Sequence, residues 1–350
     1  MSDQGASPRT HRTGAAVRPS LSDVARLAGV APITVSRVAS GKSNVKIDTR
    51  DRVLSAMDEL GYRPNRAARA LRTGRYGTIG IVASTLATYG NMRTIEGITV
   101  AARDAGFSTT LMSTEVFARD DSSTARDFLA LHDIDGIIVI LEASALEQSD
   151  LRFPDSFPVV VADGGGASQY PLVDSDQQSG AALATAHLLS LGHSTVFHIA
   201  GPASSFAAAQ RATAWRATLE KAGAPVPPEF VGDWTSGSGH RLGAELAAMP
   251  EVTAIFAAND QMALGAMLAM HEAGRDIPRD VSVVGFDDTP DSGAFWPPLT
   301  TVRQHFDIVG SRLVEALIGQ FDDGQVEQST RIVPVELVVR ASTAAPAHRP

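Results

Sequence analysis

Short apolar runs alternate with stretches of helical periodicity from Tyr76 onward. The runs are too short for buried helices, and glycine or polar residues bound them, which is typical of strands in a parallel sheet. We expect strands at 78–83, 136–141, 158–163, 195–200, 254–258 and 281–286, and helices at 92–105, 181–191, 207–222 and 261–273. This alternation predicts βαβ units, and therefore an α/β core whose parallel sheets are covered by helices on both faces.

Polar side chains directly follow three of these runs. Asp163, Asn259-Asp260 and Asp287-Asp288 each stand where a strand is expected to end. Ligands of such folds bind beyond the carboxyl ends of the strands. Any one of these residues alone is more often a helix cap or a turn residue, but their recurrence in one chain favours a binding site. Because carboxylates and amides hydrogen-bond hydroxyl groups, the pattern favours a sugar as ligand.

Patterns that would indicate an enzyme are weak or absent. The chain has no cysteine and no Gly-x-Ser-x-Gly nucleophile elbow. Asp287 and Asp288 are adjacent on an expected strand, so their side chains point to opposite faces. The glycines at 164–166 lack the lysine of a phosphate loop, and His193 and His198 have no metal-ligand partners at useful spacing. We therefore expect no enzyme, no metal site and no cofactor.

The first 75 residues differ in charge from the rest of the chain. They hold 14 Lys and Arg against 6 Asp and Glu; the chain totals are 30 and 39, which leaves 16 against 33 for the remainder. A basic segment before an acidic body is either a solvated leader or a surface that binds phosphates. No apolar run follows the polar residues 1–19, and no stretch approaches the roughly 20 apolar residues that span a bilayer. Together with the absence of cysteine, this suits a cytoplasmic protein.

Three short helices are expected in the basic segment. The first covers about 21–28 behind a serine that can cap it, and a glycine follows. The second begins at Pro32, which has no N–H to satisfy at a first helical position. The third begins after Asp48 as its N-cap and ends at Gly61. A tight turn between the first two helices is typical of a helix-turn-helix, which places its second helix in the major groove, although other three-helix bundles share this spacing.

Three blocks occur in this segment in a specific order: LSDVARLAGV at 21–30, TVSRV at 34–38 and LGYRPNRAA at 60–68. Together they resemble the headpiece of the lactose-repressor family of DNA-binding regulators. The resemblance implies that the residues after the third block form a hinge helix on operator DNA. One such helix per subunit would enter the minor groove and insert Leu71 between bases, which bends the duplex.

The same resemblance divides the DNA contacts into three groups. Phosphates would be met by Thr34, Ser36 and Asn65, base edges by Pro32, Ile33 and Arg37, and the minor groove by Ala68 and Leu71. Arg37 has the donors to address guanine, whereas Pro32 and Ile33 can touch only apolar edges such as a thymine methyl. Ala31 and Ser40 depart from the residues usual in the family, so the operator is expected to differ while the mode of docking is kept.

The core also resembles this family, in the blocks ANDQMALGAM at 258–267, VSVVGFDDT at 281–289 and PPLTTVRQ at 297–304. The resemblance covers about residues 21 to 340. It implies two Rossmann-like lobes of the periplasmic-binding-protein type, linked by three crossovers near 175, 303 and 330, with a sugar between the lobes. The expected organisation is a leader at 1–19, a helix-turn-helix domain at 20–62, a hinge helix at 63–75, the core at 76–341 and a tail at 342–350.

Position by position, the resemblance implies a set of ligand contacts. Sugar hydroxyls would be bonded by Asp163, Arg211, Asn259 and Asp287, the ring of Trp234 would face the sugar, and Gln304, Phe306 and Asn91 would complete the wall. Trp234 could instead be a core aromatic, but Asp233 before it and Thr235-Ser236-Gly237 after it indicate a loop. Thr88, Gly90 and Asn91 replace a more apolar lining, which leaves the identity of the effector open.

These observations predict a repressor of carbohydrate-utilisation genes. A dimer would bind a near-palindromic operator, and a galactoside or another disaccharide would release it. No leucine heptad follows Arg340, so a dimer is expected rather than a tetramer. Two alternatives stay open: a regulator of the same family that takes a purine or phosphorylated metabolite as corepressor, and a transport-type sugar-binding protein without a regulatory role.

Overall fold

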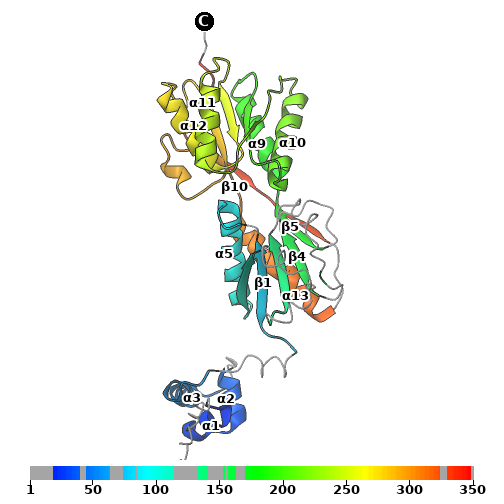
Figure 1. The fold of residues 1–350 in the computed structure, drawn as a ribbon, viewed down its shortest axis with the longest axis vertical. Helices are drawn as coiled ribbons and strands as arrows, with labels where there is room; N and C mark the ends of the chain where they lie inside the picture. The colour runs from blue at the N-terminus through cyan, green and yellow to red at the C-terminus, as the bar shows by residue number, and fades with distance from the viewer. Residues whose placement is uncertain are drawn as a thin grey trace, which may run out of the picture. The chain divides into compact units, whose positions relative to one another are not determined.

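The structure is a computed structural model, and it describes residues 19–39, 45–63, 74–83, 85–113, 133–140, 153, 157–162, 170–323 and 329–347. The chain divides into two compact units, Met1–Arg75 and Tyr76–Pro350, which we call the headpiece and the core (Figure 1). Four of the predicted site residues, Asn65, Ala68, Leu71 and Asp163, lie outside the described residues.

The headpiece consists of helices α1 (Leu21–Ala28), α2 (Pro32–Ala39) and α3 (Ile47–Leu60). Ser20 caps α1 in a capping box: its hydroxyl accepts from the N–H of Asp23, whose carboxylate accepts from the N–H of Ser20 at 2.9 Å. Gly29 ends α1 with a φ of 66°, a conformation that favours glycine. Val24, Val35 and Val53, one from each helix, are fully buried in a common apolar core.

The predicted start of the third helix is wrong. Helix α3 begins at Ile47 behind Lys46, which makes no side-chain capping bond, so Asp48 lies within the first turn instead of capping it. A carboxylate in the first turn still stabilises the helix, because it faces the positive end of the helix dipole.

A six-stranded parallel sheet forms the first lobe of the core, in the order β11-β5-β4-β3-β1-β2. Its strands are β1 (Thr78–Ala83), β2 (Ser108–Ser113), β3 (Gly136–Ile140), β4 (Val159–Ala162), β5 (Leu172–Ser175) and β11 (Thr330–Val333). Helices α5 (Tyr89–Asp104) and α13 (Phe306–Asp323) cover one face, where Ile98 and Leu313 pack with Ile81.

A second six-stranded sheet forms the other lobe, in the order β12-β10-β9-β8-β6-β7. Its strands are β6 (Phe197–Ala200), β7 (Phe230–Val231), β8 (Ala254–Ala257), β9 (Ser282–Asp287), β10 (Thr300–Arg303) and β12 (Glu336–Val338). Only the β10–β12 pair is antiparallel among the strand pairs described in this sheet.

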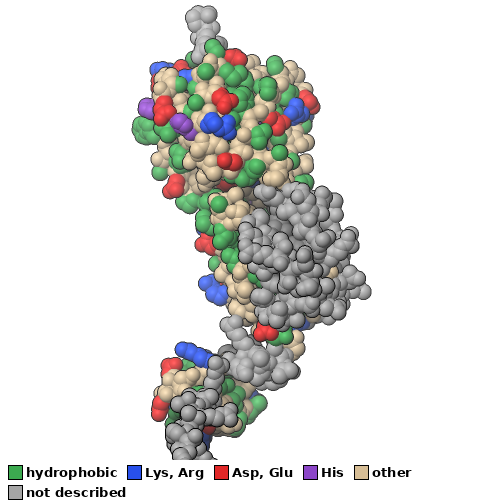
Figure 2. All heavy atoms as spheres, in the orientation of Figure 1, with side chains coloured by type: hydrophobic (Ala, Val, Ile, Leu, Met, Phe, Trp, Pro, Cys, Tyr) green, Lys and Arg blue, Asp and Glu red, His purple; other side chains and the backbone are tan. Residues whose placement is uncertain are grey.

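Helices cover both faces of this second sheet (Figure 1). Helices α9 (Gln177–Ser190) and α10 (Phe206–Lys221) pack on the face that carries Phe256 and Phe286. Helices α11 (Ser236–Ala247) and α12 (Asp260–Glu272) pack on the face that carries Ile255 and Val283, and a short 3-10 turn spans Ser292–Ala294. Figure 2 shows acidic and basic side chains scattered among hydrophobic ones on the visible face of this lobe.

The chain passes between the two sheets three times. It leaves the first sheet after β5, returns after β10 to form α13, and leaves again between β11 and β12. The carboxyl ends of the parallel strands and the crossovers therefore meet around one region of the core. In the part of the chain that the structure describes, no helix is long and apolar enough to cross a membrane.

The first residues of the segment predicted as a tail, 342–350, pack on the second lobe. Ser342 is fully buried, its hydroxyl accepts from the N–H of Thr300 at 2.8 Å and donates to the carbonyl of Val283 at 2.6 Å. The carbonyl of Ala344 lies 3.1 Å from Nε2 of His193. Ser342 and Ala344 therefore bond to the second lobe, although they follow the core boundary predicted at residue 341.

Candidate functional site

A pocket in the core is lined by seven of the eight predicted ligand contacts. These are Asn91, Arg211, Trp234, Asn259, Asp287, Gln304 and Phe306; the eighth, Asp163, lies outside the described residues. The lining residues come from the N-terminal parts of α5, α9, α10 and α13, from the N-cap of α12, from the carboxyl ends of β3, β4, β5 and β9, and from the loops that carry Trp234 and Gln304. Residues from both sheets thus line one pocket, at the strand ends where ligands of α/β folds bind.

Arg211 is the positively charged side chain among the described residues that line the pocket, and it is 4% exposed. Its Nε donates to Oε1 of Gln177 at 2.8 Å, its Nη1 donates to the carbonyl of Ala258, and its Nη2 lies 3.9 Å from Oδ1 of Asp287. The guanidinium also stacks over Phe286, 3.7 Å from the ring centroid. These contacts fix the plane of the guanidinium, as binding of neighbouring hydroxyls by one arginine requires.

Asp287 and Gln304 form the second polar element. Nε2 of Gln304 donates to Oδ1 of Asp287 at 2.7 Å, and both side chains are buried. Burial raises the pKa of Asp287 to about 7, against the opposing effect of the Arg211 charge. A carboxyl that titrates near neutral pH can accept or donate a hydrogen bond at modest cost, which suits a hydroxyl-rich ligand.

Trp234 lies in the loop before α11, with a φ of 72°. Its ring centroid lies 5.5 Å from the Arg211 guanidinium, and its backbone carbonyl accepts from Nδ2 of Asn259 at 3.0 Å. The ring packs against the backbone of Gly201, where a Cβ would overlap it. An aromatic face held beside an arginine is an arrangement that binds the apolar face of a sugar ring.

The two polar residues at the end of β8 have different surroundings. Asn259 caps α12, its Oδ1 accepts from the N–H of Met262 at 2.9 Å, and it lines the pocket. Asp260 is fully buried and accepts from Thr289 N–H at 2.8 Å and from the hydroxyls of Ser292 and Thr301 at 2.5 Å. Burial raises its pKa to about 6. Asp260 is therefore committed to internal bonds that support the end of β9.

The first turn of α5 and Phe306 form the remaining wall. Phe306 packs edge-on against Tyr89, with ring centroids 5.8 Å apart. Asn91 donates from Nδ2 to the carbonyl of Thr85 at 3.1 Å, and Thr88 and Gly90 line the pocket beside it. The hydroxyl of Thr88 makes no capping bond to α5, so this wall offers polar groups to a ligand.

Sequence reasoning missed the polar residues at the end of β5. Gln177 links Arg211 to Gln304, since its Nε2 donates to Oε1 of Gln304 at 3.2 Å and to Oδ1 of Asp174 at 3.4 Å. Burial raises the pKa of Asp174 to about 6. The strand before them, LVDS, is short and half polar, so apolar periodicity gave no signal. The pairing of Asp174 with Asp176 and Gln177 was the available clue, because it resembles the other polar strand ends.

The helix-turn-helix residues are displayed on α2 of the headpiece. Pro32, Ile33 and Arg37 are exposed, with Ile33 57% exposed, and Thr34 and Ser36 are half-buried. Val35 and Val38 occupy the opposite face and hold α2 on α1 and α3. The exposed face of α2 therefore leaves the side chains of Pro32, Ile33 and Arg37 accessible to another molecule.

Comparisons with known proteins agree with this architecture. The family model for bacterial regulatory proteins of the lacI family matches residues 20–65, and that for a periplasmic binding protein-like domain matches residues 185–343. The Lactose operon repressor of Escherichia coli (strain K12) is 35% identical over 334 residues, which cover 93% of this chain and 91% of the repressor. The chain belongs to the lacI family of bacterial regulatory proteins. It is a DNA-binding transcriptional regulator with a ligand-binding domain, in a family of regulators rather than enzymes.

Other members of the lacI family are similar along their full length. The HTH-type transcriptional repressor PurR of Haemophilus influenzae (strain PittEE) is 32% identical over 335 residues, 92% of this chain and 98% of PurR. The crystal structure of the lac repressor dimer bound to operator and the anti-inducer ONPF superposes with a TM-score of 0.78 at 33% identity, covering 94% of this chain and all of that chain. The CelR–cellobiose complex gives 0.66 at 31% identity, covering 93% and 100%. The predicted family and fold class are confirmed.

No group of three or more His, Asp or Glu side chains that could hold a metal occurs among the described residues. His198 is fully buried between the rings of Trp215 and Phe256, and burial lowers its pKa to about 4. His193 bonds Thr253 and Ser282 at 3.0 and 3.1 Å. Both histidines therefore serve the packing of the second lobe.

Proposed function

We propose that this lacI-family regulator is a repressor whose effector is a neutral sugar bound in the core pocket. The observation that carries the proposal is the convergence of Arg211, Asp287 and Asn259 on a pocket that Trp234 borders. Fixed hydrogen-bonding groups beside an aromatic face match the alternating hydroxyls and apolar ring face of a sugar. The CelR structure, which is similar to this chain, is a complex with cellobiose and supports a sugar as ligand.

We propose that residues on the exposed surface of α2 and in the segment after α3 contact the operator. Arg37 would read a guanine, Pro32 and Ile33 would meet apolar base edges, and Thr34, Ser36 and Asn65 would bind phosphates. Ala68 and Leu71 would enter the minor groove from the hinge segment. Two copies on a near-palindromic operator supply two such surfaces, so the active form proposed is a cytoplasmic dimer.

Effector control follows from the position of the pocket between elements of both sheets. A sugar that bonds Arg211 and Asp287 in the second lobe and contacts Asn91 in the first favours one arrangement of the lobes. DNA binding changes only as far as the sugar's affinities for the DNA-competent and incompetent arrangements differ. We propose that the sugar favours the arrangement with weaker operator affinity, and that a galactoside or another disaccharide is the inducer.

The test is a titration of the protein–operator complex. The operator is selected from randomised duplexes and labelled with fluorescein, and lactose, other galactosides, cellobiose, guanine, hypoxanthine and fructose phosphates are added in turn while anisotropy is recorded. We expect one sugar to lower the anisotropy. If a purine or a phosphorylated compound raises operator affinity and no sugar acts, the sugar assignment is wrong and the corepressor alternative holds.

A further inference from the structure

Asp288 adjoins the pocket residue Asp287 in sequence but serves different partners. Its side chain is 7% exposed, and each carboxylate oxygen accepts one bond from an arginine. Oδ2 accepts from Nε of Arg303 at 2.6 Å, and Oδ1 accepts from Nη2 of Arg340 at 2.6 Å. Because both oxygens are bonded to fixed cations, the carboxylate is held in one orientation.

The backbone at this position is strained. Asp287 has a φ of 117° and Asp288 a φ of 53°, and side-chain-bearing residues rarely adopt either value. Two consecutive positive φ angles persist only where the surroundings hold them. The paired carboxylate of Asp288 supplies that hold, together with the Asp288 N–H, which donates to the Thr301 hydroxyl at 3.4 Å. The direction in which Asp287 enters the pocket therefore depends on Asp288.

Arg303 connects this strained pair to two neighbouring strands. In the sheet, it lies opposite Asp287 of β9 on one side and opposite Glu336 of β12 on the other. Its Nη1 donates to Oε1 of Glu336 at 2.9 Å. The residue after Arg303 is Gln304, which donates to Asp287 in the pocket. Residues 287 and 304 thus meet in the pocket, while 288 and 303 meet directly behind it.

The same ion pairs border two of the three crossovers. Arg303 is the last residue of β10 before the chain returns to the first lobe, and Glu336 is the first residue of β12 after the chain leaves it. A change in the direction of either crossover must move Arg303 or Glu336, and through them Asp288.

We propose that Asp288, Arg303, Arg340 and Glu336 form a brace that positions Asp287 and Gln304 for the ligand and couples them to the two crossovers. Asp288 is a positioning residue, since it acts on the ligand through Asp287. The inference rests on the proposed function of the pocket for its biological meaning, but the brace itself is a property of the ligand-free protein.

Hydrogen–deuterium exchange of the full-length, ligand-free protein tests the brace. Asp288→Asn is expected to speed exchange at least tenfold in the segments 286–290 and 302–306, without a matching change in β6 or β8. Glu336→Gln is the sharper variant, because Glu336 is 54% exposed on its side chain and its removal leaves the Asp288–Arg340 pair intact. If Glu336 acts through Arg303, exchange rises at least threefold in 286–290, a segment that Arg303 links to Glu336 by bonding both Asp288 and Glu336.

Glu229→Gln is the matched control, since it removes a surface ion pair of the same lobe, Arg216 with Glu229 at 2.7 Å, away from the pocket. The proposal of a brace is wrong if both Asp288→Asn and Glu336→Gln exchange in 286–290 at the wild-type rate. It is also wrong if exchange rises equally throughout the second lobe. The exchange measurement needs no sugar. If no sugar changes operator binding, the proposed function is wrong, but the exchange measurement still tests the brace.

Discussion

Gln304 donates from Nε2 to Oδ1 of Asp287 across 2.7 Å, and its amide oxygen accepts from Gln177 at 3.2 Å. Gln177 in turn accepts from Arg211 and donates to Asp174, so one chain of bonds joins residues from β5, α9, α10 and β9 and from the loop between β10 and α13. Such a network holds its donors and acceptors in place before a ligand arrives, which lowers the ordering cost of binding. Changes to its members should alter effector affinity more than they alter the fold.

Arg211→Lys is expected to weaken the binding of the sugar that acts on the operator complex by roughly 10- to 100-fold. An ammonium lacks the planar fork with which Arg211 bonds both Gln177 and the Ala258 carbonyl, and a bond to a charged group contributes about 1.5–3 kcal/mol. Isothermal titration calorimetry measures the dissociation constant. Arg216→Lys, at an exposed arginine of the same helix, is the control; equal affinities in wild type and Arg211→Lys would show that Arg211 is not a ligand contact.

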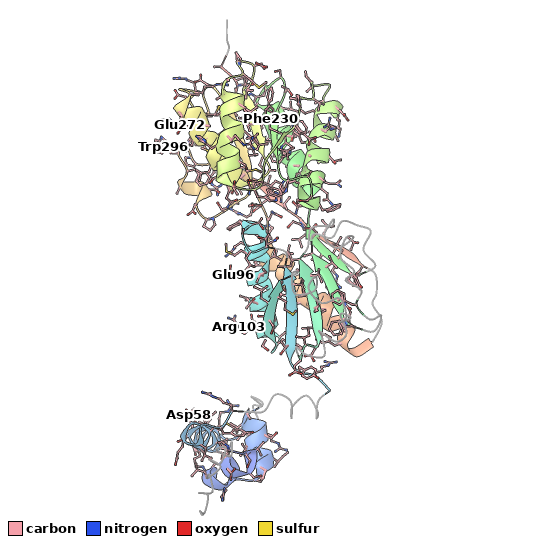
Figure 3. All side chains as sticks on the ribbon, viewed as in Figure 1. Asp58, Glu96, Arg103, Phe230, Glu272 and Trp296 are labelled. Carbon is pink, nitrogen blue, oxygen red and sulfur yellow. The ribbon has the colours of Figure 1, made fainter. Side chains whose placement is uncertain are left out.

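Gly201→Ala tests the position of Trp234 without altering any polar group. The added Cβ would overlap the indole ring, so the ring must move, at a cost of about 1–3 kcal/mol for overpacking. We expect weaker sugar binding and unchanged operator affinity. Trp296, labelled in Figure 3, lies at the surface with 95% exposure, and Trp215 is fully buried, so a Trp296→Phe background leaves Trp234 as the accessible fluorophore. Gly237→Ala, whose Cβ meets only Thr235 Oγ1 at 3.7 Å, should behave as wild type. An unshifted Trp234 spectrum in Gly201→Ala contradicts the expectation.

The raised pKa of Asp287 predicts how the free energy of unfolding depends on pH. Burial raises its pKa from 3.8 to about 7, so between these values the folded protein keeps a proton that the unfolded chain has released. The stability that this proton contributes is full below pH 3.8 and is lost as the pH rises through 7. Asp174 and Asp260, with pKa values raised to about 6, act in the same direction.

In Asp287→Asn the loss of stability between pH 5 and pH 8 should be smaller than in wild type, by at least about 1 kcal/mol, since one pKa unit corresponds to about 1.4 kcal/mol. Urea unfolding of both proteins at the two pH values measures the difference. Identical losses in the two proteins would mean that Asp287 titrates at its ordinary pKa in the folded state.

Arg37→Ala should weaken operator binding by about 1–3 kcal/mol and relax the preference at one base pair of each half-site. Sugar binding should not change, because Arg37 belongs to the headpiece and the pocket to the core. Arg26→Ala is the matched control on α1, where Arg26 pairs with Asp23 and its side chain is 79% exposed. A uniform loss over all operator sequences would instead assign Arg37 to a phosphate.

Much of the pocket could be predicted because parallel strands end at one edge of a sheet. Asn259 and Asp287 come at the ends of short apolar runs, so each run predicted both a strand and the position of the polar residue at its carboxyl end. The surroundings of their neighbours could not be predicted in the same way. Asp260 begins α12 and turns toward Ser292 and Thr301, partners that come from segments with no apolar signal of their own.

Helix α11 was missed because of its glycines, which lower helix propensity and break the apolar pattern. The structure explains why glycine occupies these positions. A Cβ at Gly239 would overlap the backbone of Met262, and a Cβ at Gly243 would lie 2.6 Å from Cα of Ala266. Helices α11 and α12 pack closely at these glycines, and a contact between two helices is not visible in the sequence of either one.

The most direct test of the central claim compares operator affinity with and without the sugar that lowers anisotropy, in wild type and in Trp234→Ala. At a sugar concentration about ten times the wild-type dissociation constant, we expect the wild-type operator affinity to fall by about 4- to 10-fold, since linkage limits the fall to one plus the ratio of sugar concentration to dissociation constant. Trp234→Ala should bind the operator as tightly as wild type and show almost no response to the sugar. A wild type that answers no sugar, or a Trp234→Ala variant that answers as wild type does, would contradict the assignment of this pocket as the site of a sugar effector.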